Sequence, residues 1–294
     1  MTYHEFLTQI KEQILNHIEE PESYDITIRK VRKNNDVVLD GLSIIGRDQN
    51  VSPTIYLNSY FEQYQEGRDL ASIVNEIYYI YVNNPPDALG VEPEDFNSFE
   101  YVKGSIFFRI VNFETNQILL EDCPFYKIQD LAVTFRVLAQ KDDKGIATVM
   151  ITNAMMKHWN VTMEDLKMLA CVNTPVLFPV QVVPLSKVLE DYIELDCHET
   201  VPLYVLTNSV GINGASCILY EDALRNLAQE WGTDIYVLPS SVQEVLLLPV
   251  QKEFDKDYIK SIVKDANKTV VSKEEFLSDH VYYYLKETNE MIIA

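Results

Sequence analysis

Residues 203–249 constrain the fold of this chain more than any other stretch. They contain two short apolar runs, an amphipathic helix followed by Gly232, and two further apolar runs joined by a Pro-Ser-Ser turn. Short apolar runs between turn residues are typical of buried strands, and glycine commonly ends a helix. The order predicts a ββαββ unit over residues 201–250, with strands at residues 201–207, 215–220, 234–238 and 242–249.

The first 83 residues predict a helix–strands–helix subdomain. An apolar residue at every fourth position indicates a helix over residues 2–19, which Pro21 ends. Alternating polar and apolar residues then predict a hairpin over residues 24–45. A short strand and two helices follow, at residues 53–58, 59–67 and 70–82.

Residues 84–100 are predicted to be a linker, because they combine adjacent prolines with five acidic residues and no basic residue. Residues 101–294 are predicted to be a second, C-terminal α+β domain that contains the ββαββ unit. The remaining elements expected in it are a hairpin at 128–139 and 146–152, a helix from Thr162 to about residue 172, an apolar proline-spaced connection at 175–191, short helices at 254–266 and 273–279, and a strand or ordered tail at 281–285.

Strands and helices do not alternate regularly, and several strands follow one another closely enough to form hairpins. This favours an α+β fold with mainly antiparallel sheets, helices packed on one face and two subdomains. The chain has 294 residues and is 47% hydrophobic, which is ample for one large core or two ordinary ones. No apolar run is long enough for a membrane helix, and the N-terminus lacks the features of a signal peptide, so we expect a cytoplasmic protein.

The chain is strongly acidic, with 45 acidic and 24 basic residues and a net charge of −21. Phosphate would repel such a chain, so we expect no direct binding to nucleic acid. The charge is consistent with simple solubility. A second interpretation is an acidic mimic of nucleic acid that inhibits a protein with a basic surface.

Several blocks of sequence resemble DUF5688, a family of uncharacterised proteins from gut Firmicutes, and more remotely DUF1444. The family has no known activity, so the resemblance implies none. The blocks are Pro53–Asn58, Ile151–Asn153 with Trp159-x-Val-Thr, Asn173-Thr174, Leu203–Asn208, Gly214-Ala215, Ile218–Tyr220 and Leu238–Ser241.

The sequence contains no phosphate-binding glycine loop, zinc-protease motif, calcium loop or nucleophile elbow. The four cysteines form no C-x-x-C pair, and no two of the five histidines have metal-ligand spacing, so no metal and no cofactor is predicted. The weak catalytic candidates are Asn208, Ser240, Ser241 and Glu244, because the ends of their strands would converge at one edge of a sheet. The competing interpretation is a turn whose hydroxyls satisfy backbone groups.

Tyrosine is abundant, with 18 residues, and is enriched at protein interfaces. The predicted protein-binding surface is formed by Tyr56, Tyr60, Tyr64, Tyr78 and Tyr81. The leading hypothesis is a non-enzymatic module that binds another protein, with a homo-oligomer left open. The alternatives are a hydrolase or transferase with a site near Asn208, Ser241 and Glu244, and the acidic mimic.

Overall fold

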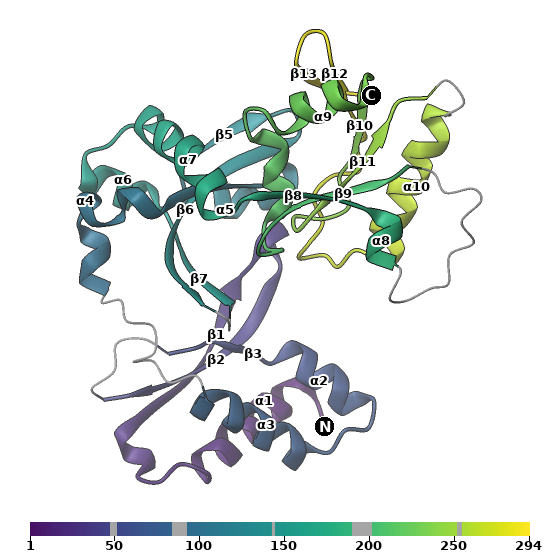
Figure 1. Ribbon diagram of the computed structural model, residues 1–294. Coiled ribbons are helices and arrows are strands. Elements are labelled where there is room, and N and C mark those ends of the chain that lie inside the picture. The colour runs from purple at the N-terminus through teal and green to yellow at the C-terminus, as the bar shows by residue number, and fades with distance from the viewer. Residues whose placement is uncertain (48–51, 84–92, 143–144, 190–201, 252–254) are drawn as a thin grey trace. The chain divides into compact units, whose positions relative to one another are not determined.

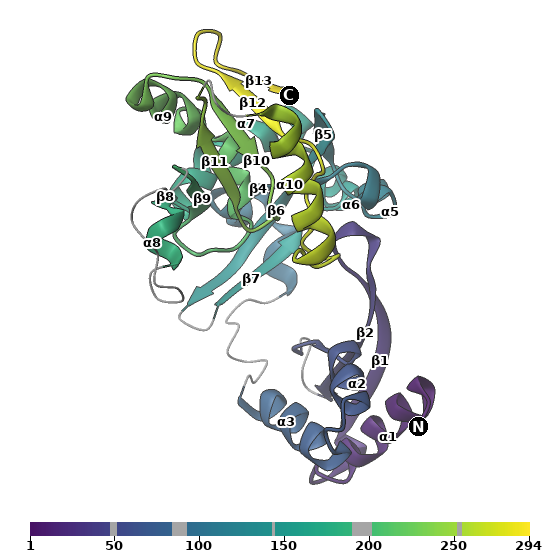
Figure 2. The ribbon, with the colours of Figure 1, turned by 90° about the vertical axis from the view of Figure 1, so that its right-hand side faces the viewer.

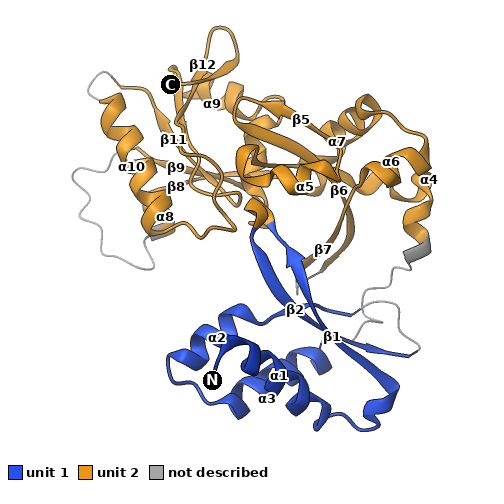
Figure 3. Ribbon diagram, turned by 180° about the vertical axis from the view of Figure 1, so that it is seen from behind, with its two compact units in different colours: residues 1–33, 37–93 blue, residues 34–36, 94–294 orange. Residues whose placement is uncertain are grey.

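The computed structural model, shown in Figure 1, describes residues 1–47, 52–83, 93–142, 145–189, 202–251 and 255–294. These residues form two compact units, which are coloured separately in Figure 3. Unit 1 contains residues 1–33 and 37–93, and unit 2 contains residues 34–36 and 94–294. Most of the predicted linker, residues 84–92, lies outside the described residues. No helix of the described part has the length and apolar character needed to cross a membrane.

Unit 1 packs three helices against a three-stranded antiparallel sheet of order β1-β2-β3. Helix α1 begins where it does because Thr2 and Glu5 form a reciprocal capping box. Its apolar stripe of Phe6, Ile10 and Ile14 is fully buried in the core of the unit. The elements are α1 (Tyr3–Leu15), β1 (Tyr24–Arg32), β2 (Val38–Gly46), β3 (Ile55–Tyr56), α2 (Asn58–Gln65) and α3 (Leu70–Asn83).

Unit 2 contains two further antiparallel sheets, which confirms the α+β class. The six-stranded sheet has the order β13-β12-β10-β11-β9-β8. Its strands are β8 (Val180–Pro184), β9 (Tyr204–Asn208), β10 (Ile235–Leu238), β11 (Val245–Pro249), β12 (Tyr282–Leu285) and β13 (Glu290–Ile293). The four-stranded sheet joins β4 (Ile106–Asn112), β5 (Phe125–Ile128) and β7 (Gly145–Met150) to the long strand β6 (Leu131–Asp142).

The main core of unit 2 is built from one face of each sheet. Ile106, Phe108 and Ile110 of β4 share it with residues such as Val237 and Leu247 of the six-stranded sheet. Helix α10 packs against the same sheet through a separate cluster, and Figure 2 shows it alongside β10 and β11. The helices are α4 (Phe99–Val102), α5 (Gln117–Glu121), α6 (Asn153–Trp159), α7 (Met163–Leu177), α8 (Leu185–Leu189), α9 (Ala223–Trp231) and α10 (Lys256–Thr269).

The predicted ββαββ unit needs one correction. Its second strand, expected over residues 215–220, is a buried 3-10 helix, η7 (Gly214–Leu219). Gly214 approaches the chain so closely that an added Cβ would lie 2.1 Å from the hydroxyl of Thr207 and 2.4 Å from the carbonyl oxygen of Gln243. A short apolar run has no periodicity that separates a buried strand from a buried helical turn, which explains the error.

Two other predictions also change. The connection expected over residues 175–191 holds the last turn of α7, with Pro175 inside it, and strand β8. Residues 273–279 do not form a helix, whereas the strand predicted near residue 281 is present as β12 and continues through a hairpin into β13. Pro175 lies near the end of α7, where it disturbs few backbone hydrogen bonds, so the helix continues past it.

Candidate functional site

The predicted catalytic candidates do come together at one edge of the six-stranded sheet. Strand β9 pairs antiparallel with β11, which places Leu206 opposite Val245. The end of β9 therefore lies beside the turn that precedes β11, and the hydroxyl of Thr207 donates to the carbonyl of Gln243 at 2.9 Å.

The polar groups at this edge are engaged with the backbone. Asn208 is only 3% exposed, and its side chain accepts from the N–H groups of Val210 and Gly211 and donates to the carbonyl of Ile212. The hydroxyl of Ser241 accepts from the N–H of Gln243 at 3.0 Å.

Neither Ser240 nor Ser241 is bonded to a His, Asp or Glu side chain of the described residues. Glu244 is half-buried, and its carbonyl accepts from the N–H of Ser241. The arrangement is therefore that of a capped turn, in which no hydroxyl is activated as a nucleophile.

The five predicted interface tyrosines belong mainly to the core of unit 1. Tyr60 is buried, and its hydroxyl donates to Glu76. The others are half-buried and contact neighbouring side chains, so each takes part in the packing of unit 1 while part of its side chain stays exposed. The remaining four are Tyr56, Tyr64, Tyr78 and Tyr81.

Unit 2 also holds a polar cluster that the sequence did not reveal. The carboxylate of Asp130 accepts from Ser278 at 2.5 Å and Tyr282 at 2.7 Å, and it lies 3.0 Å from Nδ1 of His280. The residue types are those of a catalytic triad. However, Asp130 and Ser278 lie at the same ring nitrogen of His280, Nδ1, and the side chain of Ser278 is 0% exposed. A triad needs the serine at the opposite nitrogen and accessible to substrate, so the geometry indicates a structural anchor.

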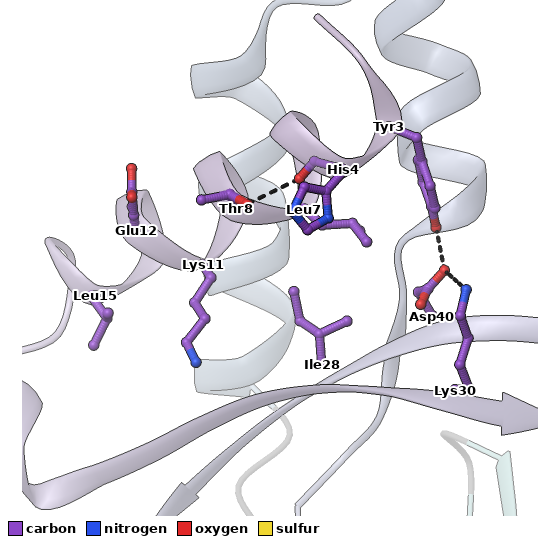
Figure 4. A pocket seen from close by; sticks show the side chains of 10 residues that line it. All are labelled: Tyr3, His4, Leu7, Thr8, Lys11, Glu12, Leu15, Ile28, Lys30 and Asp40. Carbon is purple, nitrogen blue, oxygen red and sulfur yellow. Dashed lines mark hydrogen bonds and ion pairs between the residues drawn. The ribbon is translucent and has the colours of Figure 1, made fainter.

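A groove in unit 1 is the best candidate for a binding site. It has a volume of about 670 Å³ and runs between α1 and β1. We call it the α1–β1 groove, and Figure 4 shows the side chains along it. Its lining residues are Tyr3, His4, Leu7, Thr8, Lys11, Glu12, Leu15, Ile28, Lys30 and Asp40.

The apolar part of the groove comes from the flank of α1 next to its buried stripe. Leu7 and Leu15 from the helix and Ile28 from β1 are half-buried, so each leaves part of its side chain uncovered. In Figure 4 the side chains of Leu7 and Ile28 occupy the space between helix and strand. These side chains offer an apolar floor to a ligand.

Asp40 is the one buried carboxylate of the groove lining, and two partners compensate it. The hydroxyl of Tyr3 and the ammonium of Lys30 both donate to its Oδ2 atom at 2.8 Å. Burial of Tyr3, together with its bond to Asp40, raises the pKa of the phenol well above its ordinary value, so the hydroxyl stays protonated. The exposed charges that remain at the rim are mainly those of Lys11, Lys30 and Glu12.

The strand that borders the groove is an edge strand. Strand β1 pairs with β2 on one side, and no described strand pairs with its other side. Four of the five residues at positions 29–33 are basic, although the chain as a whole is strongly acidic. This basic run was visible in the sequence, but its place beside a helix flank was not.

The comparisons with known proteins identify a family without identifying a role. The model of a family of unknown function, DUF5688, matches residues 3–286. No curated protein and no solved structure matches the chain.

Proposed function

Because the chain belongs to DUF5688, a family of unknown function, we propose its role from its own geometry: unit 1 binds an extended segment of another protein in the α1–β1 groove. The observation that carries the proposal is the pairing of an edge strand with a half-open apolar helix flank. Peptides recognised by strand addition use this combination, in which backbone hydrogen bonds to the edge supply affinity and side-chain pockets supply specificity.

The dimensions of the groove fit a short peptide. From Tyr3 to Leu15 helix α1 extends for about 18 Å, at a rise of about 1.5 Å per residue. An extended peptide advances by about 3.3 Å per residue, so about five or six residues lie along the helix. Alternate side chains of such a peptide would face Leu7, Ile28 and Leu15.

The charges select the kind of peptide. Lys30 faces the groove from the edge strand and Lys11 faces it from the helix, whereas Arg29 lies next to Lys30 on the opposite face of the strand. Lys30 and Asp40 compensate each other, which leaves Lys11 and Glu12 as the unpaired charges of the lining, while the basic run of residues 29–33 lies along the edge strand. We therefore expect a segment in which apolar and acidic residues alternate, because opposite charges across an interface favour both encounter and register.

This proposal keeps the predicted protein-binding role but moves the surface away from the tyrosines. It has more support than the hydrolase alternative, because Asn208 and Ser241 are already bonded to backbone groups. It also differs from the acidic-mimic alternative, since the groove is bordered by a basic strand.

The test is fluorescence anisotropy of the full chain with a labelled peptide of eight residues that alternates leucine or valine with glutamate. We expect saturable binding. A peptide N-methylated at the amides of one edge should bind at least tenfold more weakly, because those amides cannot donate to β1. A peptide with lysine in place of glutamate should also bind weakly.

The matched variants are Lys11→Glu in the groove and Lys264→Glu on the exposed side of α10. Lys11→Glu should weaken binding about two- to tenfold, and Lys264→Glu should leave it unchanged. Absence of binding, or equal binding of the N-methylated and unmodified peptides, would overturn the proposal.

A further inference from the structure

Two arginines of unit 2 share one face of the four-stranded sheet. Ile106, Phe108 and Ile110 of β4 face the main core, so Arg109 between them faces the other side of the sheet. The register places Arg109 opposite Thr134 and Arg136 opposite Phe107. Arg109 and Arg136 are therefore diagonal neighbours on this face, at a typical separation of about 7–8 Å.

The positive charge of this pair is not compensated within the described part of the chain. The Nε atom of Arg109 is buried and has no hydrogen-bond partner. Arg136 donates through Nε to the hydroxyl of Thr148 at 2.9 Å, which is a neutral partner. Neither arginine forms an ion pair with a described carboxylate.

The burial and charge around the two arginines also shift the pKa values of Arg109 and Cys123. Burial, and then the charge of Arg136, lowers the pKa of Arg109 to about 9. The thiol of Cys123 interacts with Arg109 but does not serve as a counterion, because burial raises its pKa to about 11 and so keeps it neutral at pH 7. Two arginines thus stand as diagonal neighbours in a partly desolvated place, and the repulsion between their charges is costly unless an anion compensates them.

The chemistry of the pair defines the anion that would fit. A guanidinium presents a planar fork of N–H donors, which matches two oxygens of a phosphate or carboxylate. Two such forks carry two positive charges, so a dianion with several oxygens compensates them better than a monoanion. The hydroxyls of Thr134 and Thr148 lie on the same face, and Arg109 and Arg136 are both half-buried, so solvent reaches part of each.

We propose that Arg109 and Arg136 form a binding site for a dianionic phosphoryl group, either inorganic phosphate or a small phosphate monoester. The site belongs to unit 2 and is independent of the α1–β1 groove of unit 1. Failure of one proposal therefore leaves the other standing.

The first experiment is calorimetric titration of the full chain with inorganic phosphate at pH 7.5 and constant ionic strength. A second arm uses glycerol 3-phosphate, and a third uses acetate. We expect one site that takes phosphate or its ester and binds acetate at least tenfold more weakly. Tighter binding of glycerol 3-phosphate than of phosphate assigns the site to an ester, and the reverse order assigns it to the free ion.

The second experiment compares Arg109→Gln and Arg136→Gln with Arg225→Gln, an exposed arginine paired with Asp222. Each of the first two should lose at least tenfold in phosphate affinity, and the control should lose none. Low-millimolar phosphate at ten times Kd should raise the Tm of the wild-type chain by about 3–6 °C but not that of Arg109→Gln. Without phosphate, Arg109→Gln should be as stable as wild type or more stable, because it removes a partly desolvated charge that no described carboxylate compensates.

A purely structural role for Arg109 predicts the opposite pattern, in which Arg109→Gln is less stable in both buffers and responds to phosphate as wild type does. That result would overturn the proposal. If Arg109→Gln does not fold, Arg109→Lys keeps the charge and the stem but loses the fork, and should still weaken phosphate binding. Failure of the wild-type chain to bind either phosphate or its ester would also overturn the proposal.

Discussion

Asp130 shows how one carboxylate can stabilise a region made from distant parts of the chain. Its burial alone would raise its pKa, but hydrogen bonds from Ser278, Tyr282 and His280 outweigh burial and hold the pKa below its ordinary value. The stabilisation is therefore complete above the unfolded pKa, near 4, and is lost as the pH falls through the lower folded value.

We predict that Asp130→Asn lowers the free energy of unfolding at pH 7 by about 1–3 kcal/mol, because it removes a charged acceptor from two buried hydroxyl donors. The difference from wild type should shrink as the pH falls from 5 to 2. Urea denaturation at several pH values measures both effects. The control Asp222→Asn, on an exposed ion pair, should change stability by less than about 1 kcal/mol. A difference that stays constant with pH would contradict the ionic explanation.

At the scale of single residues, the sequence predicts contacts between residues close together in the chain but not contacts between residues far apart in it. The alternative interpretation of Ser241 as a turn residue agrees with its bond to the N–H of Gln243, two residues away. Asp130 and His280 are 150 residues apart and flank strands of different sheets, so only the packing of unit 2 brings them together. The same holds for Arg109 and Arg136, whose proximity depends on the register of β4 and β6.

Among the elements, helix α7 begins at a capping box that can be recognised in the sequence. The hydroxyl of Thr162 accepts from the N–H of Asp165, and the carboxylate of Asp165 accepts from the N–H of Thr162. We predict that Thr162→Ala lowers the free energy of unfolding by about 1 kcal/mol, because the first turn loses its cap. Urea denaturation measures the change. Thr269→Ala, at an exposed position in the last turn of α10, should stay within about 0.5 kcal/mol of wild type.

Elements with local signals were predicted better than elements set by packing. The helix at Thr162 and the hairpin of β1 and β2 follow from capping and alternation, which neighbouring residues determine. Residues 214–218 of η7 are all buried, so apolar residues occur in it without any period, and even Ser216 lies inside. Strand β8 was missed because Pro184 and Pro179 mark it as a connection, yet an edge strand has unpaired positions at which proline is tolerated.

At the scale of the whole molecule, charge is the property that the sequence states most directly. A net charge of −21 implies mutual repulsion within the folded state. We predict that Tm rises when NaCl is increased from about 20 mM to about 200 mM, since the screening length falls from about 20 Å to less than 10 Å. Differential scanning calorimetry measures the shift. A Tm that falls over this range would mean that attractive ion pairs outweigh the repulsion.

Residues 34–36 join β1 to β2 but belong to unit 2. Asn35 has a left-handed backbone, with φ of 57°, and its side chain donates to the carbonyls of Lys273 and Phe276. We predict that Asn35→Ala lowers the free energy of unfolding by about 2–4 kcal/mol, through lost hydrogen bonds and backbone strain. Asn35→Gly should lose less, because glycine adopts this backbone freely. Urea denaturation of the three proteins separates the two contributions, and equal losses would exclude strain.

The place of residues 34–36 has a consequence for the order of synthesis. β1 and β2 leave the ribosome before residues 273–276, and their pairing requires nothing made later. Asn34 and Asn35, however, donate to carbonyls 238–241 residues further along the chain. A ribosome that adds about 5–20 residues per second therefore takes about 12–48 seconds to supply these acceptors. During that time the turn between β1 and β2 lacks these hydrogen-bond acceptors, in a nascent chain that is exposed to chaperones and proteases.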